Sequence, residues 1–384
     1  MDFLLYVGLF SLVICGAAAL EVLLGVHHIG QLQDITPLPP EEYPLVSIII
    51  PALNEAATVE PALASVLALD YPALEIIAIN DRSTDETGAI LERMAEKESR
   101  LKVYHIDQLP GDWLGKNHAL WFGAGKARGK LLLFTDADVV MEKSSLQRAV
   151  SFMLAERLDH LAVFFDILVP GGLLNMLIID SGWAFLSWMK PWRARLVESR
   201  YHVGVGAFNL VRADMYHRCG THRAIANHPV DDVELGRLIK SCGGLQDCLF
   251  GRRAISVKWY GSLAEMAVGL EKNIFPFCNY SVLMVLAATF IVLLLRIWPL
   301  AAIFVCQGQV LAVNWLLVLF QVAMALLVAG NSSIARHHVL WFPLAPFVGL
   351  YMLWRATVKT LLRGGIVWRD TFYSLDQLKK NLKQ

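Results

Sequence analysis

Two short acidic patterns in this sequence have the residue types that bind metal–diphosphate groups and move protons. The first is Asp136-Ala137-Asp138, directly after the apolar run Leu131–Thr135. Mg²⁺ and Mn²⁺ prefer oxygen ligands and often bind one or two carboxylates together with substrate phosphates. We therefore predict an Mn²⁺ or Mg²⁺ site at Asp136 and Asp138, where the chain leaves a strand. The pattern is short, and a capped turn is the alternative interpretation.

The second pattern is Asp231-Asp232, with Glu234 close behind, at the start of a helical stretch that continues to about Lys240. Acidic residues in the first turn of a helix are ordinary partners of the helix dipole. Three carboxylates exceed what capping needs, and one of them could serve as a general base beside a hydroxyl group.

Polar residues also follow two earlier strands. The first of these strands ends in Pro51-Ala52-Leu53-Asn54-Glu55, and the second ends at Asn80 followed by Asp81. Ligands of open α/β sheets bind beyond the carboxyl ends of the strands, so these segments are candidate binding residues for a heterocycle and a ribose. We expect Asp81 to accept from a base N–H, with Glu55 beside it. For Ser83 and Thr84 we expect helix capping.

Lys116 opens another predicted helix, immediately after Gly115. The free N–H groups and the dipole of a helix N-terminus favour anions, and the ammonium group would add a point charge for a phosphate. A solvated surface lysine is the alternative, and the sequence leaves both open.

The elements that must position these residues alternate between short β-branched runs and helical patterns. This alternation predicts an α/β domain with a largely parallel sheet and helices on both faces. The predicted strands are Val46–Ile50, Glu75–Asn80, Leu101–Ile106 and Leu131–Thr135.

The composition points to a membrane protein. Of the 384 residues, 56% are hydrophobic and only 18% are charged, and the mean hydropathy is +0.48. These values exclude a disordered or collagen-like chain. Lys and Arg together number 34, as do Asp and Glu, so no overall field attracts nucleic acid. The 6 cysteines are too few for a disulfide scaffold, and the spacing of Cys219, Cys242 and Cys248 does not favour zinc.

Apolar residues are concentrated at both ends of the chain. Residues 3–26 are long enough to span a bilayer, and we expect a retained anchor because no Lys or Arg precedes the run. A cleaved signal peptide is the alternative. Three further apolar runs follow the α/β domain, and a basic tail after them should face the cytoplasm. The middle run is one long, two short or one broken helix. These runs are Ser281–Leu295, Ile297–Gly330 and Val339–Trp354.

The order of these motifs resembles the family 2 glycosyltransferases with a GT-A fold. The motifs that carry the resemblance are Pro51–Glu55, Asp81, Lys116, Asp136-Ala137-Asp138 and Asp231-Asp232. With one N-terminal anchor and a C-terminal membrane cluster, the chain resembles hopanoid-biosynthesis-associated glycosyltransferases, with ceramide and carotenoid glycosyltransferases as neighbours. The domains expected from this are an anchor (1–28), a Pro-rich linker (29–44), a GT-A domain (45–273), a membrane region (274–356) and a basic tail (357–384).

The resemblance implies a nucleotide-diphosphate sugar donor, UDP-linked. Because the anchors would hold the catalytic domain against the bilayer, we expect a lipid acceptor. We expect the enzyme at the inner membrane of a bacterium, with the catalytic domain in the cytoplasm. It assigns Asp81 to the base or ribose, and Asp136 and Asp138 to the metal–diphosphate. Asp232 would be the base for one inverting displacement, unlike glycosidases, which use a pair of carboxyl groups.

The chain departs from many relatives at one place, because it has no Gln-x-x-Arg-Trp motif after the base. The comparable stretch is 269–275, and Lys272 or Trp368-Arg369 are the candidates to replace the motif. This departure weakens any interpretation as a processive polysaccharide synthase. Three rivals remain: a polyprenyl-phosphate sugar transferase, a nucleotide-sugar-binding protein without turnover, and a transporter, for which the apolar runs carry few ionisable residues.

Overall fold

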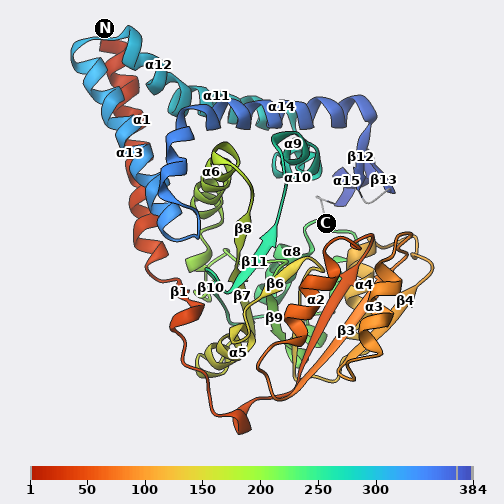
Figure 1. Cartoon of the computed structure of the whole chain (residues 1–384). Helices are drawn as coiled ribbons and strands as arrows, with labels where there is room; N and C mark the ends of the chain where they lie inside the picture. Colours follow the sequence, from red (N-terminus) through yellow and green to blue (C-terminus); the bar gives the residue numbers. More distant parts are fainter. Residues whose placement is uncertain (1, 369–370, 382–384) are drawn as a thin grey trace. The chain divides into compact units, whose positions relative to one another are not determined.

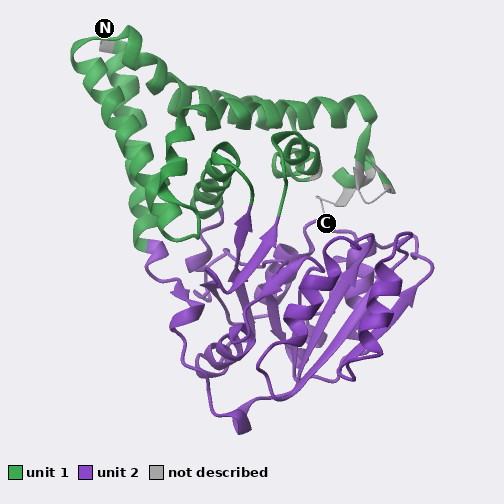
Figure 2. Cartoon of the chain, viewed as in Figure 1, with its two compact units in different colours: residues 1–24, 169–188, 259–384 green, residues 25–168, 189–258 purple. Residues whose placement is uncertain are grey.

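The chain folds into two compact units, each built from separate stretches of sequence. A computed structural model describes residues 2–368 and 371–381 (Figure 1). The α/β unit comprises Gly25–Leu168 and Met189–Lys258 (Figure 2). The helical unit comprises Met1–Leu24, Val169–Trp188 and Trp259–Gln384. The chain leaves the α/β unit at Val169 and returns at Met189. The domain bounds expected from the sequence, with a GT-A domain at 45–273, stay a prediction.

An eight-stranded sheet forms the centre of the α/β unit. Its strand order is β1-β10-β7-β9-β5-β2-β3-β4, and only β9 runs antiparallel to its neighbours β5 and β7. The mixed but largely parallel sheet expected from the sequence is therefore confirmed. The strands are β1 (Gly30–Gln31), β2 (Val46–Ala52), β3 (Leu74–Asp81), β4 (Leu101–Ile106), β5 (Leu131–Phe134), β7 (His160–Phe164), β9 (Asn209–Arg212) and β10 (Gln246–Phe250).

Helices cover both faces of this sheet. Successive side chains of a strand point to opposite faces, so a strand whose residues are all buried must be covered on both. On β2, Ile48 and Ile50 pack in one core with α2, α3 and α5, whereas Ile49 packs in another with α4, α7 and α8. A strand buried on both faces is a continuous apolar run, and β2 fits this description. The helices are α2 (Val59–Leu67), α3 (Thr87–Ala95), α4 (Gly115–Ala124), α5 (Ser145–Ala155), α7 (Ala213–Arg218) and α8 (Asp231–Ser241).

A second, three-stranded sheet extends the α/β unit. In it, β11 (Ile255–Lys258) lies between β6 (Val139–Met141) and β8 (Asp166–Leu168). Because β6 begins directly after Asp138, this small sheet fixes one end of the predicted metal-binding turn.

The segment 29–44, expected to be a plain linker, contributes to the α/β unit. Its first residues form β1, which pairs with β10 at the edge of the main sheet. Leu32 is fully buried and Tyr43 nearly so, and the Tyr43 hydroxyl lies 3.0 Å from Ser151 Oγ of α5. The prolines therefore shape a segment that packs on the core.

Among its described residues, the helical unit holds four helices that are long and apolar enough to cross a membrane, judged by length and composition. They are Phe3–Val26, Val282–Val305, Gly308–Gly330 and Arg336–Arg363. Its elements are α1 (Asp2–Val26), α6 (Gly172–Met189), α9 (Leu263–Gly269), α10 (Glu271–Phe277), α11 (Val282–Val292), a π-helical turn η5 (Leu293–Ile297), α12 (Trp298–Val305), α13 (Gly308–Gly330), η6 (Arg336–Leu344), α14 (Ala345–Arg363), β12 (Gly365–Trp368), β13 (Thr371–Ser374) and α15 (Leu375–Asn381).

The C-terminal apolar segments number three, as expected, but the break falls elsewhere. The helix continues through Arg296 and ends at Val305, where Gln307 is extended and Gly308 adopts a φ of +60°. Left-handed backbone of this kind favours glycine. The Arg296 guanidinium pairs with Asp180 of α6 at 2.6 Å. These two charged groups therefore neutralise each other.

Candidate active site

The loop after β2 is hydrogen-bonded to the loop after β3. The Asn54 backbone N–H donates to Ser83 Oγ at 3.1 Å, and Asn54 Oδ1 accepts from the Thr84 N–H at 2.8 Å. Asn54 has a φ of 55°, a conformation that asparagine tolerates better than most residues. The predicted capping role of Ser83 and Thr84 is wrong, since both bind Asn54. Asp85 caps the first turn of α3 instead, because its carboxylate accepts a hydrogen bond from the Thr87 N–H.

The other predicted binding residues of this loop divide into buried and accessible ones. Pro51 and Ala52 are buried strand residues paired in register with Ile79 and Asn80, which leaves little of their side chains for a ligand. Glu55 accepts from Thr58 Oγ1 at 3.0 Å. The charge of Glu55 is one of the causes that raise the pKa of Asp138.

Asp81 ends β3 with a carboxylate that is 1% exposed and bound on both oxygens. Arg82 donates to it from Nε at 2.7 Å and from Nη2 at 2.9 Å. Arg82 was not singled out from the sequence, although it adjoins Asp81. A Cβ on Gly115 would lie 2.5 Å from Arg82 Nη2 and 2.9 Å from Asp81 Oδ2. The start of α4 therefore lies close to this pair, and a larger residue at 115 would require the Arg82 or Asp81 side chain to shift.

Asp136 and Asp138 lie on either side of the buried Ala137, in the turn between β5 and β6. Burial and then the charges of Asp136 and Glu55 raise the pKa of the Asp138 carboxyl to about 6. A carboxyl in this position gains stability from a cation, since a positive charge would offset the repulsion.

Lys116 lies between two predicted catalytic segments. Its Nζ is 2.8 Å from Asp136 Oδ1 and 3.2 Å from Asp231 Oδ1, and the side chain is only 11% exposed. Burial by itself lowers the pKa of this ammonium group, but the carboxylates of Asp136, Asp231 and Asp232 together raise it above its ordinary value. The solvated lysine considered from the sequence is therefore excluded. A phosphate contact remains a prediction.

Asp231 and Asp232 begin α8 and face different partners. The Asp231 carboxylate is buried against Lys116, whereas Asp232 Oδ2 accepts the Gly206 N–H at 2.7 Å. Burial and then the neighbouring Asp231 charge raise the pKa of Asp232 to about 6, and burial also raises that of Asp231. A base with a pKa near the working pH accepts protons while still being largely ionised.

Gly206 is the point at which the two acidic patterns meet. A Cβ on this residue would lie 2.9 Å from Asp136 Oδ2, 3.3 Å from Asp232 Oδ2 and 3.5 Å from Lys116 Nζ. The structure thus brings Lys116, Asp136, Asp231 and Asp232 into one cluster, which we call the acidic cluster. Gly206 was not predicted, and its one signal in the sequence is the Gly-Val-Gly at 204–206.

Two glycines and one glutamine hold α8 against the segment 203–206. A Cβ on Gly236 would lie 1.8 Å from the Val203 carbonyl oxygen, and one on Gly204 would lie 1.8 Å from that of Asp232. Gln246 is fully buried; its Nε2 donates to the Gly236 carbonyl at 2.6 Å, and its Oε1 accepts from the Val203 N–H at 3.1 Å. Backbone therefore packs directly on backbone beneath Asp232.

The donor atoms of Asp136 and Asp138 suit Mn²⁺ or Mg²⁺, because they are carboxylate oxygens. A cation would also offset the repulsion of the Asp138 carboxylate by the charges of Asp136 and Glu55. Over residues 2–368 and 371–381, no three His, Cys, Asp or Glu side chains form a ready metal cluster. A bound ion would therefore need further oxygens from substrate or water. Of the candidate substitutes for Gln-x-x-Arg-Trp, the side chains of Lys272 and Trp368 and all of Arg369 lie outside what the structure describes.

Comparison with known proteins bears on the family and the fold. Residues 47–218 match the family Glycosyl transferase family 2, a span that includes Asp81, Lys116, Asp136 and Asp138. This match covers less than half of the chain and concerns a glycosyltransferase domain. The family predicted from the sequence motifs is thereby confirmed at the level of this domain, while the roles of the individual residues stay predictions.

Relatives and solved structures extend the comparison. The probable glycosyltransferase YdaM of Bacillus subtilis is 37% identical over 108 residues, which are 28% of this chain and 26% of YdaM. A 4,4'-diaponeurosporenoate glycosyltransferase of Staphylococcus aureus is 24% identical over 208 residues, half of each chain. The mannosyltransferase PcManGT from Pyrobaculum calidifontis, solved with GDP-Man and Mn²⁺, superposes with a TM-score of 0.54 at 18% identity, covering 94% of this chain and 99% of that one.

These matches are partial in sequence and broad in fold. The chain spans about a quarter to a half of the length of these two curated relatives. The likeness to PcManGT concerns the fold and, with the mixed sheet described above, confirms the predicted GT-A class.

Proposed function

We propose that the chain is a membrane-anchored, inverting glycosyltransferase that moves a sugar from a nucleotide-diphosphate sugar to a hydroxyl group of a lipid. The observation that carries the proposal is the acidic cluster, where Asp232 and Asp136 both lie beside Gly206. This juxtaposition puts a candidate base next to the residues assigned to the donor diphosphate.

In the proposed reaction the acceptor oxygen attacks the anomeric carbon while its proton moves to the Asp232 carboxylate. The bond from that carbon to the diphosphate oxygen breaks, and the nucleoside diphosphate leaves with the bonding electrons. The Gly206 N–H holds Asp232 Oδ2 in place, and the contact between α8 and the 203–206 segment keeps the helix from moving. One displacement of this kind inverts the anomeric configuration.

Asp136 and Asp138 would hold Mn²⁺ or Mg²⁺, with the remaining ligands from the diphosphate. Such an ion neutralises negative charge that grows on the leaving group. The support is the carboxylate pair itself and the Mn²⁺ that accompanies GDP-Man in the PcManGT complex. Asp81 would bind the base or ribose, with Arg82 fixing its carboxylate at 2.7 and 2.9 Å.

The donor is proposed to be UDP-linked and the acceptor to be a hopanoid-type lipid, acting at the cytoplasmic face of a bacterial inner membrane. Support for an apolar acceptor comes from the four candidate spans, which would hold the enzyme at the bilayer. A relative matched over half of the chain is named for 4,4'-diaponeurosporenoate, which supports an isoprenoid class of acceptor.

The test is transfer by the purified full chain in detergent, with UDP- and GDP-sugars and extracted bacterial lipids. We expect a glycolipid by mass spectrometry, release of the nucleoside diphosphate, loss of both in EDTA, and recovery with Mn²⁺ or Mg²⁺. Asp138→Ala should lower the rate by several orders of magnitude. Full activity in chelator would refute the metal assignment, and a sugar found on a polyprenyl phosphate would refute the hydroxyl acceptor.

A further inference from the structure

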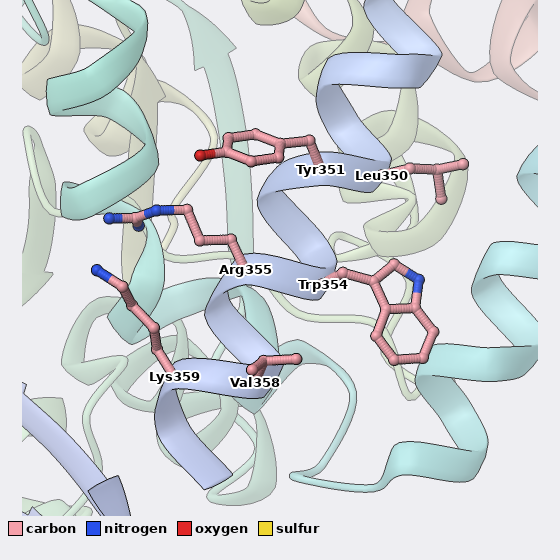
Figure 3. Close-up of a pocket in the computed structure, with 6 residues that line it drawn as sticks. All are labelled: Leu350, Tyr351, Trp354, Arg355, Val358 and Lys359. Atoms are coloured by element: carbon pink, nitrogen blue, oxygen red, sulfur yellow. The ribbon is translucent and has the colours of Figure 1, made fainter. Parts of the chain in front are cut away.

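One face of α14 carries a shallow groove of about 500 Å³ that the proposed reaction does not use. In Figure 3, Tyr351, Arg355 and Lys359 project to one side of the helix. Leu350 and Trp354 project to the other side. Residues four apart on a helix form such rows, with a groove between adjacent rows. The groove therefore has one apolar wall, which Val358 extends, and one wall that ends in two cations.

The two cations of this wall belong to a cluster in which positive charges outnumber negative ones. Arg355, Lys359 and Arg363 all pair with Glu271 at the start of α10. Lys359 Nζ lies 3.2 Å from Glu271 Oε1, and Arg363 Nη1 lies 3.3 Å from Oε2. Three cations thus share one carboxylate, and these four side chains, which we call the α14 cation cluster, carry a net charge of two positive.

The positive charge of the cluster is accessible from outside. The side chains of Lys359 and Arg363 are 38% and 49% exposed, while Glu271 is only 15% exposed. Arg355 is held more firmly, since it also donates to the Ala267 carbonyl at 2.7 Å. An anion arriving from solvent or from a lipid headgroup layer therefore meets Lys359 and Arg363 before it meets the carboxylate.

The surroundings of the cluster are apolar and exposed. Tyr351, Val358 and Leu362 on α14 are 60%, 44% and 82% exposed, and α14 belongs to a stretch apolar enough to cross a membrane. These apolar neighbours add no binding free energy for a soluble phosphate compound. An amphiphile with an anionic head is stabilised both by the charges and by contact of its apolar part with the apolar wall.

We propose that this groove binds a membrane phospholipid with an anionic headgroup. Its phosphate would accept hydrogen bonds from Lys359, Arg363 and Arg355, since guanidinium and ammonium groups both bind phosphate oxygens strongly. An acyl chain would lie along Leu350, Trp354 and Val358. Glu271 limits the affinity, because it already compensates one of the three cations. This site lies within the helical unit and does not depend on the proposed reaction.

The test is native mass spectrometry of the detergent-purified full chain titrated with phosphatidylglycerol or phosphatidylcholine. We expect phosphatidylglycerol to bind more tightly. Lys359→Gln should weaken its binding about fivefold, as expected for one basic residue near an anionic lipid surface. Lys359→Arg should restore it. Lys379→Gln, at an exposed lysine of α15, is the charge-matched control and should change nothing.

Glu271→Gln separates lipid binding from a purely structural role. Removing this carboxylate leaves the cluster with three uncompensated cations, so phosphatidylglycerol binding should strengthen. A weaker interaction in Glu271→Gln would show that the cluster only holds α10 against α14, and would overturn the proposal. Equal binding of the two lipids, or an unchanged Lys359→Gln, would also overturn it. Recovery of a polyprenyl phosphate from the purified chain would overturn the choice of occupant.

Discussion

Replacing Gly236 with alanine should misplace the candidate base without touching any group that takes part in the proposed reaction. In an isolated helix this change is favourable by about 0.8–1 kcal/mol, because alanine has the higher helix propensity. Here the new Cβ would lie 1.8 Å from the Val203 carbonyl oxygen, whereas real Cβ contacts are not shorter than 3.0 Å. The backbones of α8 and of the 203–206 segment must therefore separate by about 1.2 Å, which displaces Asp232 relative to Gly206.

A displacement of about 1 Å in a reacting group can lower a rate about 10²-fold. We therefore expect Gly236→Ala to reduce the turnover number by about this factor, while the affinity for the nucleotide-sugar stays largely unchanged. The assay is sugar transfer under saturating donor, with donor affinity measured by calorimetry and folding checked by circular dichroism.

Gly349→Ala is the matched control for this variant. Gly349 also lies within a helix, α14, but a Cβ there would meet nothing within 4 Å. This control should keep wild-type transfer. A folded Gly236→Ala variant with wild-type turnover would refute the conclusion that close backbone packing positions Asp232.

Two further predictions concern buried charges. Lys116→Met leaves the carboxylates of Asp136 and Asp231 without their shared ammonium group. Breaking such a buried pair costs about 3–5 kcal/mol, so the thermal midpoint in detergent should fall by several degrees, and an unchanged midpoint would contradict the ion-pair assignment. Burial alone would raise the pKa of Glu75, but hydrogen bonds from its neighbours, Arg128 among them, hold this pKa below its usual value. The stability from Glu75 is thus fully present above its unfolded pKa of about 4.3 and is lost as the pH falls through the folded value. Glu75→Gln should lower the midpoint at pH 7 and have less effect under acid, and equal losses at both pH values would contradict this.

The sequence predicted β2 and β5 because each is a buried, largely apolar run followed by polar residues. Leu101–Ile106 was predicted at the bounds that the structure shows, and β5 to within one residue. Strands β7, β9 and β10 were not predicted. β9 begins and ends with a polar residue, and β10 contains polar residues, Gln246 and Asp247, that are buried through long-range contacts. A pattern of single residues along the chain does not reveal such contacts.

The candidate site was predictable in its residue types but not in its pairings. Asp136, Asp138 and Asp232 were proposed from local motifs. That Lys116 lies between Asp136 and Asp231 depends on how α4 and α8 meet at the sheet edge. The role of Gly206 depends in the same way on the approach of three segments, so local sequence gives little sign of it.

Transfer by Asp232→Asn is the most direct measurement of the proposed chemistry. The amide keeps the size of the side chain but cannot accept the proton of an acceptor hydroxyl. Removing a positioned general base costs about 10²–10⁴ in rate with substrate binding largely intact. We predict a loss in that range, unchanged donor affinity and an intact fold. Asp231→Asn should be milder, because its carboxylate is buried against Lys116. Near wild-type transfer by Asp232→Asn to a lipid hydroxyl would contradict the assignment of Asp232 as the base.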